Sequence, residues 1–405
     1  MAKRENTDFF RYKTIFRAMR MPLAFVDLEK FDANIAYVAS TQNNTGKTIR
    51  IGTKSLRCTE LIKRVFQKGG SPYKGILSFT LEEAAFLVSK GFDDIIVAYP
   101  SLQPSSIKQF IKLTKSKKRI RLVIDSVEHL RILSNEGQKA GVRLSVCLDL
   151  DMSYRPLGSV HLGVRRSPIH TVEHAVKLAQ ASKAFKWVTI DAVMGYEAHI
   201  ASLCDDVPGK ILANKLMFAF KRLSSKELTI RRDTIVEALN GESINIKTVN
   251  GGGSGSLKYS GKDPILTEVT AGSAFYCSGL FQHFKDVHFL PAAFFAVEVV
   301  RKPAPGMITC LGGGYTASGE IGPNKLPTPV FPAGLKLLTR EAAGEVQTPL
   351  MLPPDCPSIE LGDPIFFQHA KAGELCERFN ELYLLEGSKI VGKVKTYRGE
   401  GKAFL

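Results

Sequence analysis

Short apolar runs rich in β-branched residues recur along the chain up to about residue 273, and amphipathic stretches separate them. The eight runs are 49–54, 75–80, 94–100, 120–125, 143–151, 187–195, 246–253 and 266–273. In the stretches between them, apolar residues fall at helical spacing and several stretches end on glycine. Eight alternating strand and helix units are the count of a (β/α)8 TIM-type barrel, whereas an open doubly wound sheet is the competing architecture. The count favours the barrel.

The pattern changes after residue 285. Proline, glycine and short alternating strands take over, at 292–300, 306–315, 363–368, 382–387 and 389–397. No long helical pattern follows, so this part is predicted to be all-β. We therefore predict an α/β barrel domain at 1–285 and a C-terminal β domain at 286–405. A further strand at 21–30 precedes the barrel, and whether it pairs with the barrel or joins the β domain is left open.

Composition agrees with two domains of an ordinary globular protein. The chain has 405 residues, of which 44% are hydrophobic and 23% are charged, and it has no stretch of about 20 apolar residues that would span a membrane. The basic, aromatic N-terminus lacks the apolar core of a secretory signal; a transit peptide is conceivable, but Glu5 and Asp8 count against one. Seven widely spaced cysteines without a CxxC pair indicate neither a disulfide framework nor a zinc ribbon, so we expect a cytoplasmic protein.

The net charge of +16 raises the question of a nucleic-acid partner. Its densest run, 112–121, lies between a helical pattern and a strand, and we interpret it as a solvated helix end. No nucleic-acid-binding motif accompanies this run. We therefore expect neither nucleic acid nor membrane as a partner. A positive field suits a phosphate-bearing cofactor and a small carboxylate substrate instead.

The first barrel strand runs into Lys54, and barrel enzymes place their chemistry at the carboxyl ends of the strands. A lysine that ends an apolar strand is either a surface residue whose aliphatic stem is buried or a Schiff-base lysine. The seventh strand ends in the segment 250–256, NGGGSGS, whose glycines let a phosphate approach the backbone N–H groups. A flexible turn is the alternative. No Walker A motif is present, and Ala271, Gly272 and Ser273 could close the same site.

A lysine at the first strand and a phosphate loop at the seventh would suit a cofactor with an aldehyde at one end and a phosphate at the other. Pyridoxal 5'-phosphate is such a cofactor. A barrel that binds a phosphorylated ligand without a Schiff base is the alternative. The second glycine run, Gly312 to Gly314, falls among the β strands and is interpreted as a tight turn.

Several segments in order resemble one family. They are MPLAFVDLEKFDANI, IRIGTKSLRC, MGYEAHI, VNGGGSGS, EVTAGSAFY and GDPIFFQHAKAGELCERFNELYLL. Together they cover nearly the whole chain and resemble the D-threonine aldolase and D-serine dehydratase group, whose N-terminal barrel is alanine-racemase-like (fold type III). The resemblance implies a pyridoxal-phosphate-dependent lyase and homodimer that cleaves or dehydrates D-β-hydroxy amino acids. An amino acid racemase and a non-catalytic pyridoxal-phosphate-binding protein are the alternatives.

The resemblance also assigns roles to individual residues. It makes Lys54 the cofactor lysine, Tyr196 a cofactor contact and Arg155 an arginine near the cofactor ring, although Arg165 competes for that place. His199 near the same mouth is either a satisfied loop residue or a proton carrier. The phosphate cup that it implies consists of Gly252, Gly253, Ser254 and Gly255.

The resemblance further implies a zinc or manganese site with a histidine and, two residues later, a cysteine or aspartate. His369 matches the first ligand, but Lys371 stands at the second position, and an ammonium cannot bind a cation. Cys376 and Glu374 lie nearby at other spacings. Either the metal is absent, with Lys371 supplying its charge, or another residue provides the ligand. Tyr276 and the 312–320 loop are predicted to line a mouth shared between two subunits.

Overall fold

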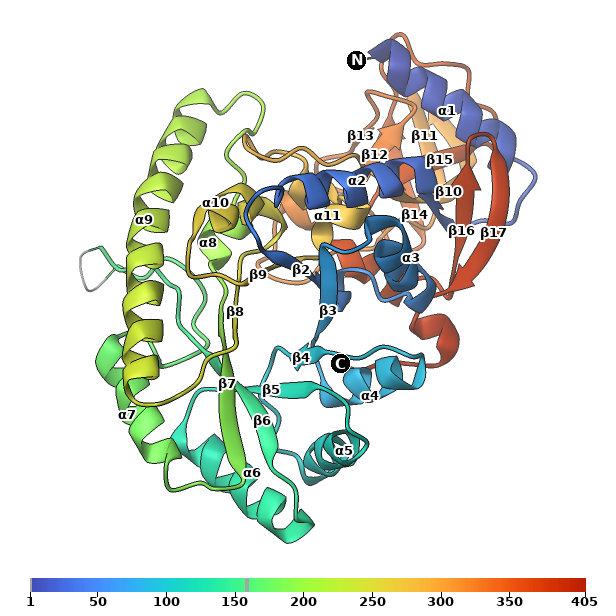
Figure 1. Ribbon diagram of the computed structural model, residues 1–405. Coiled ribbons are helices and arrows are strands. Elements are labelled where there is room, and N and C mark those ends of the chain that lie inside the picture. Colours follow the sequence, from blue (N-terminus) through green and yellow to red (C-terminus); the bar gives the residue numbers. More distant parts are fainter. Residues whose placement is uncertain (1, 157–159) are drawn as a thin grey trace.

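The computed structural model describes residues 2–156 and 160–405, and it divides into a parallel barrel and a sheet that lies to one side of it (Figure 1). All eight predicted strands form the closed barrel, so the predicted fold class is confirmed. In order they are β2 (Thr48–Gly52), β3 (Tyr73–Ser78), β4 (Ile95–Val97), β5 (Ile120–Ile124), β6 (Leu144–Asp149), β7 (Val188–Gly195), β8 (Thr248–Gly251) and β9 (Glu268–Ala271).

Helices follow the barrel strands, as the amphipathic stretches predict. They are α2 (Leu28–Ser40), α3 (Thr59–Gly69), α4 (Leu81–Ser89), α5 (Pro104–Lys115), α6 (Val127–Ala140), α7 (Val172–Ser182), α8 (Ala198–Ala201), α9 (Ile211–Gly241), α10 (Leu257–Lys262) and α11 (Ser273–Tyr276). Side-chain oxygens of Thr80, Ser126 and Thr171 accept the N–H three residues on and fix the starts of α4, α6 and α7. Among the described helices, none is both long enough and apolar enough to cross a membrane.

Short 3₁₀ turns adjoin several of these elements. They are η1 (Thr53–Ser55), η2 (Ser254–Ser256), η3 (Gly279–Phe281), η4 (Pro323–Lys325), η5 (Ala372–Glu377) and η6 (Arg398–Glu400). The turn η1 directly follows β2, which is the first barrel strand. The turn η2 lies in the glycine-rich segment that follows β8, the seventh barrel strand.

The second sheet combines C-terminal strands with one strand from the start of the chain. Its members are β1 (Leu23–Asp27), β10 (Ala293–Ala304), β11 (Met307–Leu311), β12 (Thr328–Phe331), β13 (Lys336–Leu337), β14 (Gln347–Met351), β15 (Pro364–Gln368), β16 (Glu381–Glu386) and β17 (Lys389–Lys395). Strand β1 pairs antiparallel with β10 and parallel with β16. The early strand therefore joins this sheet and not the barrel. Sequence patterning missed β12, β13 and β14, which are short and, in β12 and β14, carry prolines that break the alternation.

An N-terminal helix, α1 (Ala2–Phe16), covers one face of this sheet and was not predicted. Phe9, Tyr12 and Phe16 recur at helical spacing and are fully buried. They pack on Phe25 of β1 and Phe366 of β15 with edge-on or tilted rings. The basic, aromatic N-terminal segment is thus a helix of the β domain.

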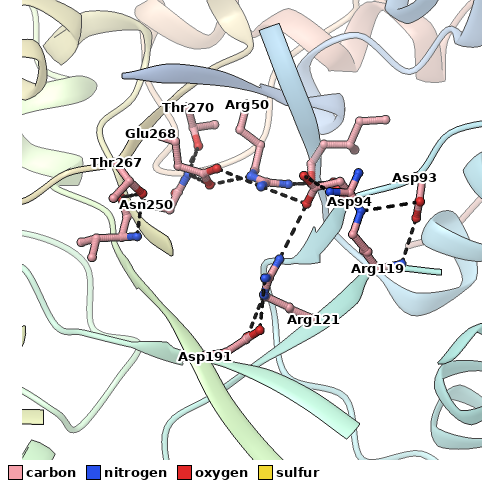
Figure 2. A network of polar contacts seen from close by, with 12 residues as sticks. Arg50, Asp93, Asp94, Arg119, Arg121, Asp191, Asn250, Thr267, Glu268 and Thr270 are labelled. Carbon is pink, nitrogen blue, oxygen red and sulfur yellow. Dashed lines mark hydrogen bonds and ion pairs between the residues drawn. The ribbon is translucent and has the colours of Figure 1, made fainter. Parts of the chain in front are cut away.

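Charged side chains cross-link the barrel strands in its interior (Figure 2). Arg50 of β2 donates to Glu268 of β9 at 2.5 Å and pairs with Asp94 just before β4 at 3.2 Å. Arg121 of β5 donates to Asp191 of β7 at 2.7 Å. Arg121 ends the basic run 112–121, and its side chain is only 15% exposed. Arg121 is therefore not part of the solvated helix end, because its side chain forms an ion pair inside the barrel.

Candidate active site

Lys54 lies in η1, directly after the first barrel strand. Its side chain is exposed, and its Nζ lies 3.4 Å from the hydroxyl of Tyr99, which follows β4. The backbone of this turn is held from the β domain, because η5 packs on η1. A Cβ at Gly373 would overlap the carbonyl oxygen of Lys54, so only glycine permits this approach. The second domain thus fixes the lysine's backbone and leaves its amine free.

A second cation lies close to two tyrosines at the same mouth. The guanidinium carbon of Arg166 is 5.5 Å from the ring centroid of Tyr99 and 5.9 Å from that of Tyr196. Tyr196 follows β7, its hydroxyl lies 2.7 Å from Ser202 Oγ, and burial raises its pKa. The structure therefore brings Tyr196 and Lys54 to one mouth through Tyr99 and Arg166, two residues that sequence reasoning missed.

The predicted arginine lies in a different setting. Arg155 donates to the carboxylate of Asp151 and to Ser153 Oγ, and these two bonds hold its guanidinium in a local ion pair. Arg165, the other candidate, is exposed. Its neighbour Arg166 is the arginine whose guanidinium lies near the two tyrosine rings.

The glycine loop follows β8 and lies against the loop that follows β9. Ser254 Oγ accepts the N–H groups of Gly272 and Ala274 at 3.2 and 3.0 Å, which ties this loop to the loop after β9. The first N–H groups of a helical turn have no intrahelical acceptors, and both η2 and α11 begin here. The predicted closing segment, Ala271 to Ser273, therefore lies against the predicted cup.

The glycines of this loop pack so closely on neighbouring atoms that there is little or no room for a side chain. A Cβ at Gly253 would lie 3.0 Å from both the Tyr196 ring and the Ala201 methyl. A Cβ at Gly255 would overlap the carbonyl oxygen of Ala201. Gly252 has a φ of +76°, a conformation that favours glycine. Such a close-packed, side-chain-free loop is suited to an anion that binds backbone N–H groups.

Two carboxylates at strand ends were also missed. Asp149 ends β6, and Asp125 follows β5 next to it. Asp149 is only 9% exposed, and burial, reinforced by the charge of Asp125, raises its pKa to about 7. Arg166 opposes this shift. An ordinary strand-end aspartate gives no sequence signal of such a change, because the shift depends on a neighbour from another strand.

This shift makes the stability of the protein depend on pH. The unfolded carboxyl has a pKa of about 3.9, so between about pH 4 and 7 the folded protein binds the extra proton. The stabilising contribution is therefore present below about pH 4 and is lost as the pH rises through 7. We expect the Asp149→Asn variant to gain stability relative to wild type across this window, by about 1.4 kcal/mol per unit of pKa shift.

Urea denaturation at a series of pH values measures this difference. The exposed Asp206 offers a matched control, because the Asp206→Asn variant should keep the pH profile of the wild type. Parallel profiles for the Asp149→Asn variant and the wild type would show that Asp149 does not carry the shift.

Two histidines near the mouth are buried and neutral. His199 on α8 and His369 after β15 have no hydrogen-bond partner for either ring nitrogen among the described residues. Burial lowers the pKa of each to about 4; at His199 the charge of Arg231 adds to this effect. At neutral pH each ring is therefore uncharged.

Comparison with known proteins places the chain in a family. The sequence pattern described as "Alanine racemase, N-terminal domain" matches residues 26–279, which is more than half of the chain. The chain belongs to this family. The family resemblance stated from the sequence is thereby confirmed, and the match spans the whole barrel from β2 to β9.

Relatives of this family member include enzymes of two kinds. A 3-hydroxy-D-aspartate aldolase from Paracoccus denitrificans is 23% identical over 255 residues, which cover 63% of this chain and 60% of the relative. The match thus spans less than two thirds of that relative's length. Two crystal structures share the fold over most of both chains: D-threonine aldolase from Filomicrobium marinum (TM-score 0.80, 16% identity, 95% and 96% covered) and D-threo-3-hydroxyaspartate dehydratase from Delftia sp. HT23 (0.75, 17%, 94% and 98%).

In this member of the alanine racemase N-terminal domain family, the predicted metal position holds an ion pair. Lys371 Nζ lies 2.6 Å from Ser318 Oγ and 3.2 Å from the carboxylate of Glu374. Within residues 2–156 and 160–405, no group of three or more His, Cys, Asp or Glu side chains could hold a metal ion. Cys376 instead donates to the carbonyl of Leu56. The residues around His369 therefore do not fit the zinc or manganese site.

The two parts of the predicted subunit mouth, Tyr276 and the 312–320 loop, make contacts within their own chain, and a mouth shared by two subunits stays a prediction. Tyr276 is fully buried, and its hydroxyl donates to the carbonyl of Leu56 at 3.0 Å. The 312–320 loop reaches the mouth through Ser318, which contacts Lys371 and Glu374. Tyr276 thus supports the Lys54 turn from within its own chain.

Proposed function

We propose that the protein is a pyridoxal-phosphate-dependent lyase that acts on D-β-hydroxy amino acids, with Lys54 as the cofactor lysine. The observation that carries the proposal is an exposed lysine and a side-chain-free glycine cup on the same barrel mouth. Family membership supports it, as do the aldolase and dehydratase activities named for the relatives. Their low identity leaves cleavage and dehydration both in the proposal.

The residues present fit the cofactor. A Cβ does not fit at Gly255 and is crowded at Gly253, and the Ser254 side chain bonds to the loop after β9, so this part of the cup would present backbone to a phosphate. Lys54 would hold the aldehyde end, and Tyr196, whose ring lies 3.0 Å from where a Cβ of Gly253 would be, would contact the cofactor. When bound, the pyridinium ring supplies an electron sink for negative charge at the substrate's Cα. No metal is included, because the residues around His369 do not fit one.

The chain's own groups account for substrate binding and for the Cα proton transfer of dehydration. In that reaction, Lys54 Nζ would be the base that takes the Cα proton. In aldol cleavage the group that must lose a proton is the β-hydroxyl. Arg166 keeps a positive charge at the mouth, which suits the carboxylate of an amino acid. The ring centroids of Tyr99 and Tyr196 lie 5.5 and 5.9 Å from the guanidinium carbon of that cation.

Product analysis tests the proposal and separates its two reactions. D-threonine, D-serine and 3-hydroxy-D-aspartate are incubated with the protein and pyridoxal phosphate, with the L-isomers as controls. Aldol cleavage yields glycine and an aldehyde, whereas dehydration yields a 2-oxo acid and ammonia. We expect one of these product pairs from at least one D-substrate. Conversion of D- to L-isomers alone, or no turnover of any of them, would contradict a lyase.

Compartment and assembly are part of the same proposal. All seven cysteines are free, which agrees with a reducing cytoplasm. The exposed loop at Ser318 lies beside the mouth, where a second copy of the chain would complete the site of a homodimer. Neither nucleic acid nor membrane is proposed as a partner.

A further inference from the structure

A fully buried arginine lies behind the glycine loop. Arg232 of α9 is 1% exposed and lies between two carboxylates that are also buried, Glu197 at 4% and Asp263 at 3%. Its guanidinium donates to Glu197 at 3.0 Å, to the carbonyl of Gly195 at 3.1 Å, and to Asp263. It therefore joins the end of β7, the segment after it and the end of α10.

One of these carboxylates reaches the loop directly. The second oxygen of Glu197 accepts the N–H of Gly252 at 2.7 Å. Gly252 is the residue with a φ of +76° at which the chain turns into the loop. Arg232 thus holds Glu197 by one oxygen, and Glu197 holds the turn by the other. A two-step chain of charge-assisted bonds fixes where the cup begins.

Charge makes this arrangement matter for an anion. Two carboxylates lie beside the loop, and water does not screen them because they are buried. Arg232 is the cation that pairs with both. Without it, two uncompensated negative charges would act on any phosphate bound in the loop, and Glu197 would be free to leave Gly252.

We propose that Arg232 and Glu197 are positioning residues that set the affinity of the glycine loop for the cofactor's phosphate. The proposal rests on the proposed function, since it takes the loop to be the phosphate cup. It adds that a side chain without contact to the cofactor decides how strongly the phosphate end is held. Neither residue belongs to the glycine motif, since Arg232 lies 20 positions and Glu197 lies 55 positions before Gly252.

The test compares two ligands that differ only in the phosphate. The dissociation constants of pyridoxal phosphate and of pyridoxal are measured on cofactor-free protein by absorbance titration. The dissociation constant of pyridoxal divided by that of pyridoxal phosphate reports the contribution of the phosphate alone. We expect the Arg232→Met variant to lower this ratio by about tenfold or more, and the Arg232→Lys variant to lower it less, because the charge remains without the fork.

The Asp263→Asn variant is the matched control. It removes the other ion pair of Arg232 but leaves the bonds from Arg232 to Glu197 and from Glu197 to Gly252. It should lose stability on heating without a lower ratio. Should the Arg232→Met variant fail to fold, the Arg232→Lys variant against this control decides the question.

The outcomes separate the two levels of the proposal. If both dissociation constants rise in parallel, so that the ratio stays at the wild-type value in the arginine variants, the positioning role is overturned and Arg232 is merely structural. If wild-type protein binds neither ligand, or binds both equally, the proposed cofactor function fails first. A ratio that falls in the arginine variants but not in the Asp263→Asn variant supports the proposal.

Discussion

The Lys54→Ala variant should lose turnover by a factor on the order of 10³ or more, together with the visible absorption of protein-bound pyridoxal phosphate. In the proposed function, the amine of Lys54 carries the cofactor and also serves as the base for the substrate's Cα proton in dehydration. Among the described residues, the polar side-chain contact of the exposed Lys54 is the long one to Tyr99, so the fold should not depend on that side chain. Stability should therefore remain close to wild type.

Absorbance spectra and initial rates measure this effect. Lys74 is an exposed lysine on the barrel strand β3, so the Lys74→Ala variant controls for the loss of a surface lysine. It should keep both the spectrum and the rate. A Lys54→Ala variant that keeps the visible band and the turnover would move the cofactor to another lysine.

The Glu268→Gln variant should lose about 3 kcal/mol of stability, because it leaves a buried charge without its main partner. Arg50 is 2% exposed and donates to Glu268 through two nitrogens, at 2.5 and 2.8 Å. Glu268 also accepts from Asn250 of β8 at 2.8 Å. The change therefore loosens three neighbouring strands of the barrel, β2, β8 and β9, below the mouth (Figure 2).

Urea denaturation measures the loss, with an exposed ion pair as the comparison. Glu136 pairs with Lys139 on the surface of α6, where the two side chains are 37% and 72% exposed. The Glu136→Gln variant should change stability by less than about 0.5 kcal/mol, because water screens the pair. If the Glu268→Gln variant lost as little stability as the Glu136→Gln variant, the barrel interior would tolerate an Arg50 without its carboxylate partner.

The barrel could be predicted from the sequence because its strands are buried on both faces. Runs such as 120–125 and 187–195 are therefore mostly apolar apart from a few polar residues such as Arg121 and Asp191, and helical periodicity fills the gaps between the runs. The same logic located Lys54 and the glycine loop, since the strand ends of a closed barrel meet at one rim. These predictions needed only the order of the elements.

The rest depended on contacts between distant segments. Arg166 and Tyr99 come from different loops, and neither residue alone is unusual in the sequence. The pKa of Asp149 depends on Asp125 of the next strand, and the buried pairing of Arg232 with Glu197 and Asp263 depends on how α9 packs. Polarity alone suggests that such side chains are exposed. Burial by tertiary packing reverses that expectation.

The N-terminal helix illustrates the same limit in the second domain. Its basic and aromatic residues made a transit peptide conceivable, against which Glu5 and Asp8 counted, whereas its aromatic residues at helical spacing pack on the sheet. Lys13 pairs with the buried Asp363 at 2.5 Å, 350 positions later in the chain. A charge that finds its partner across the fold cannot be distinguished in the sequence from a charge that faces water.

The most direct test of the account is to fix the cofactor to the protein and find where it is attached. Protein incubated with pyridoxal phosphate is reduced with borohydride, digested and mapped by mass spectrometry. The account predicts the pyridoxyl group on the peptide that contains Lys54, and its disappearance from the map of the Lys54→Ala variant. A modification at another lysine, or none above the background of surface lysines, would contradict it.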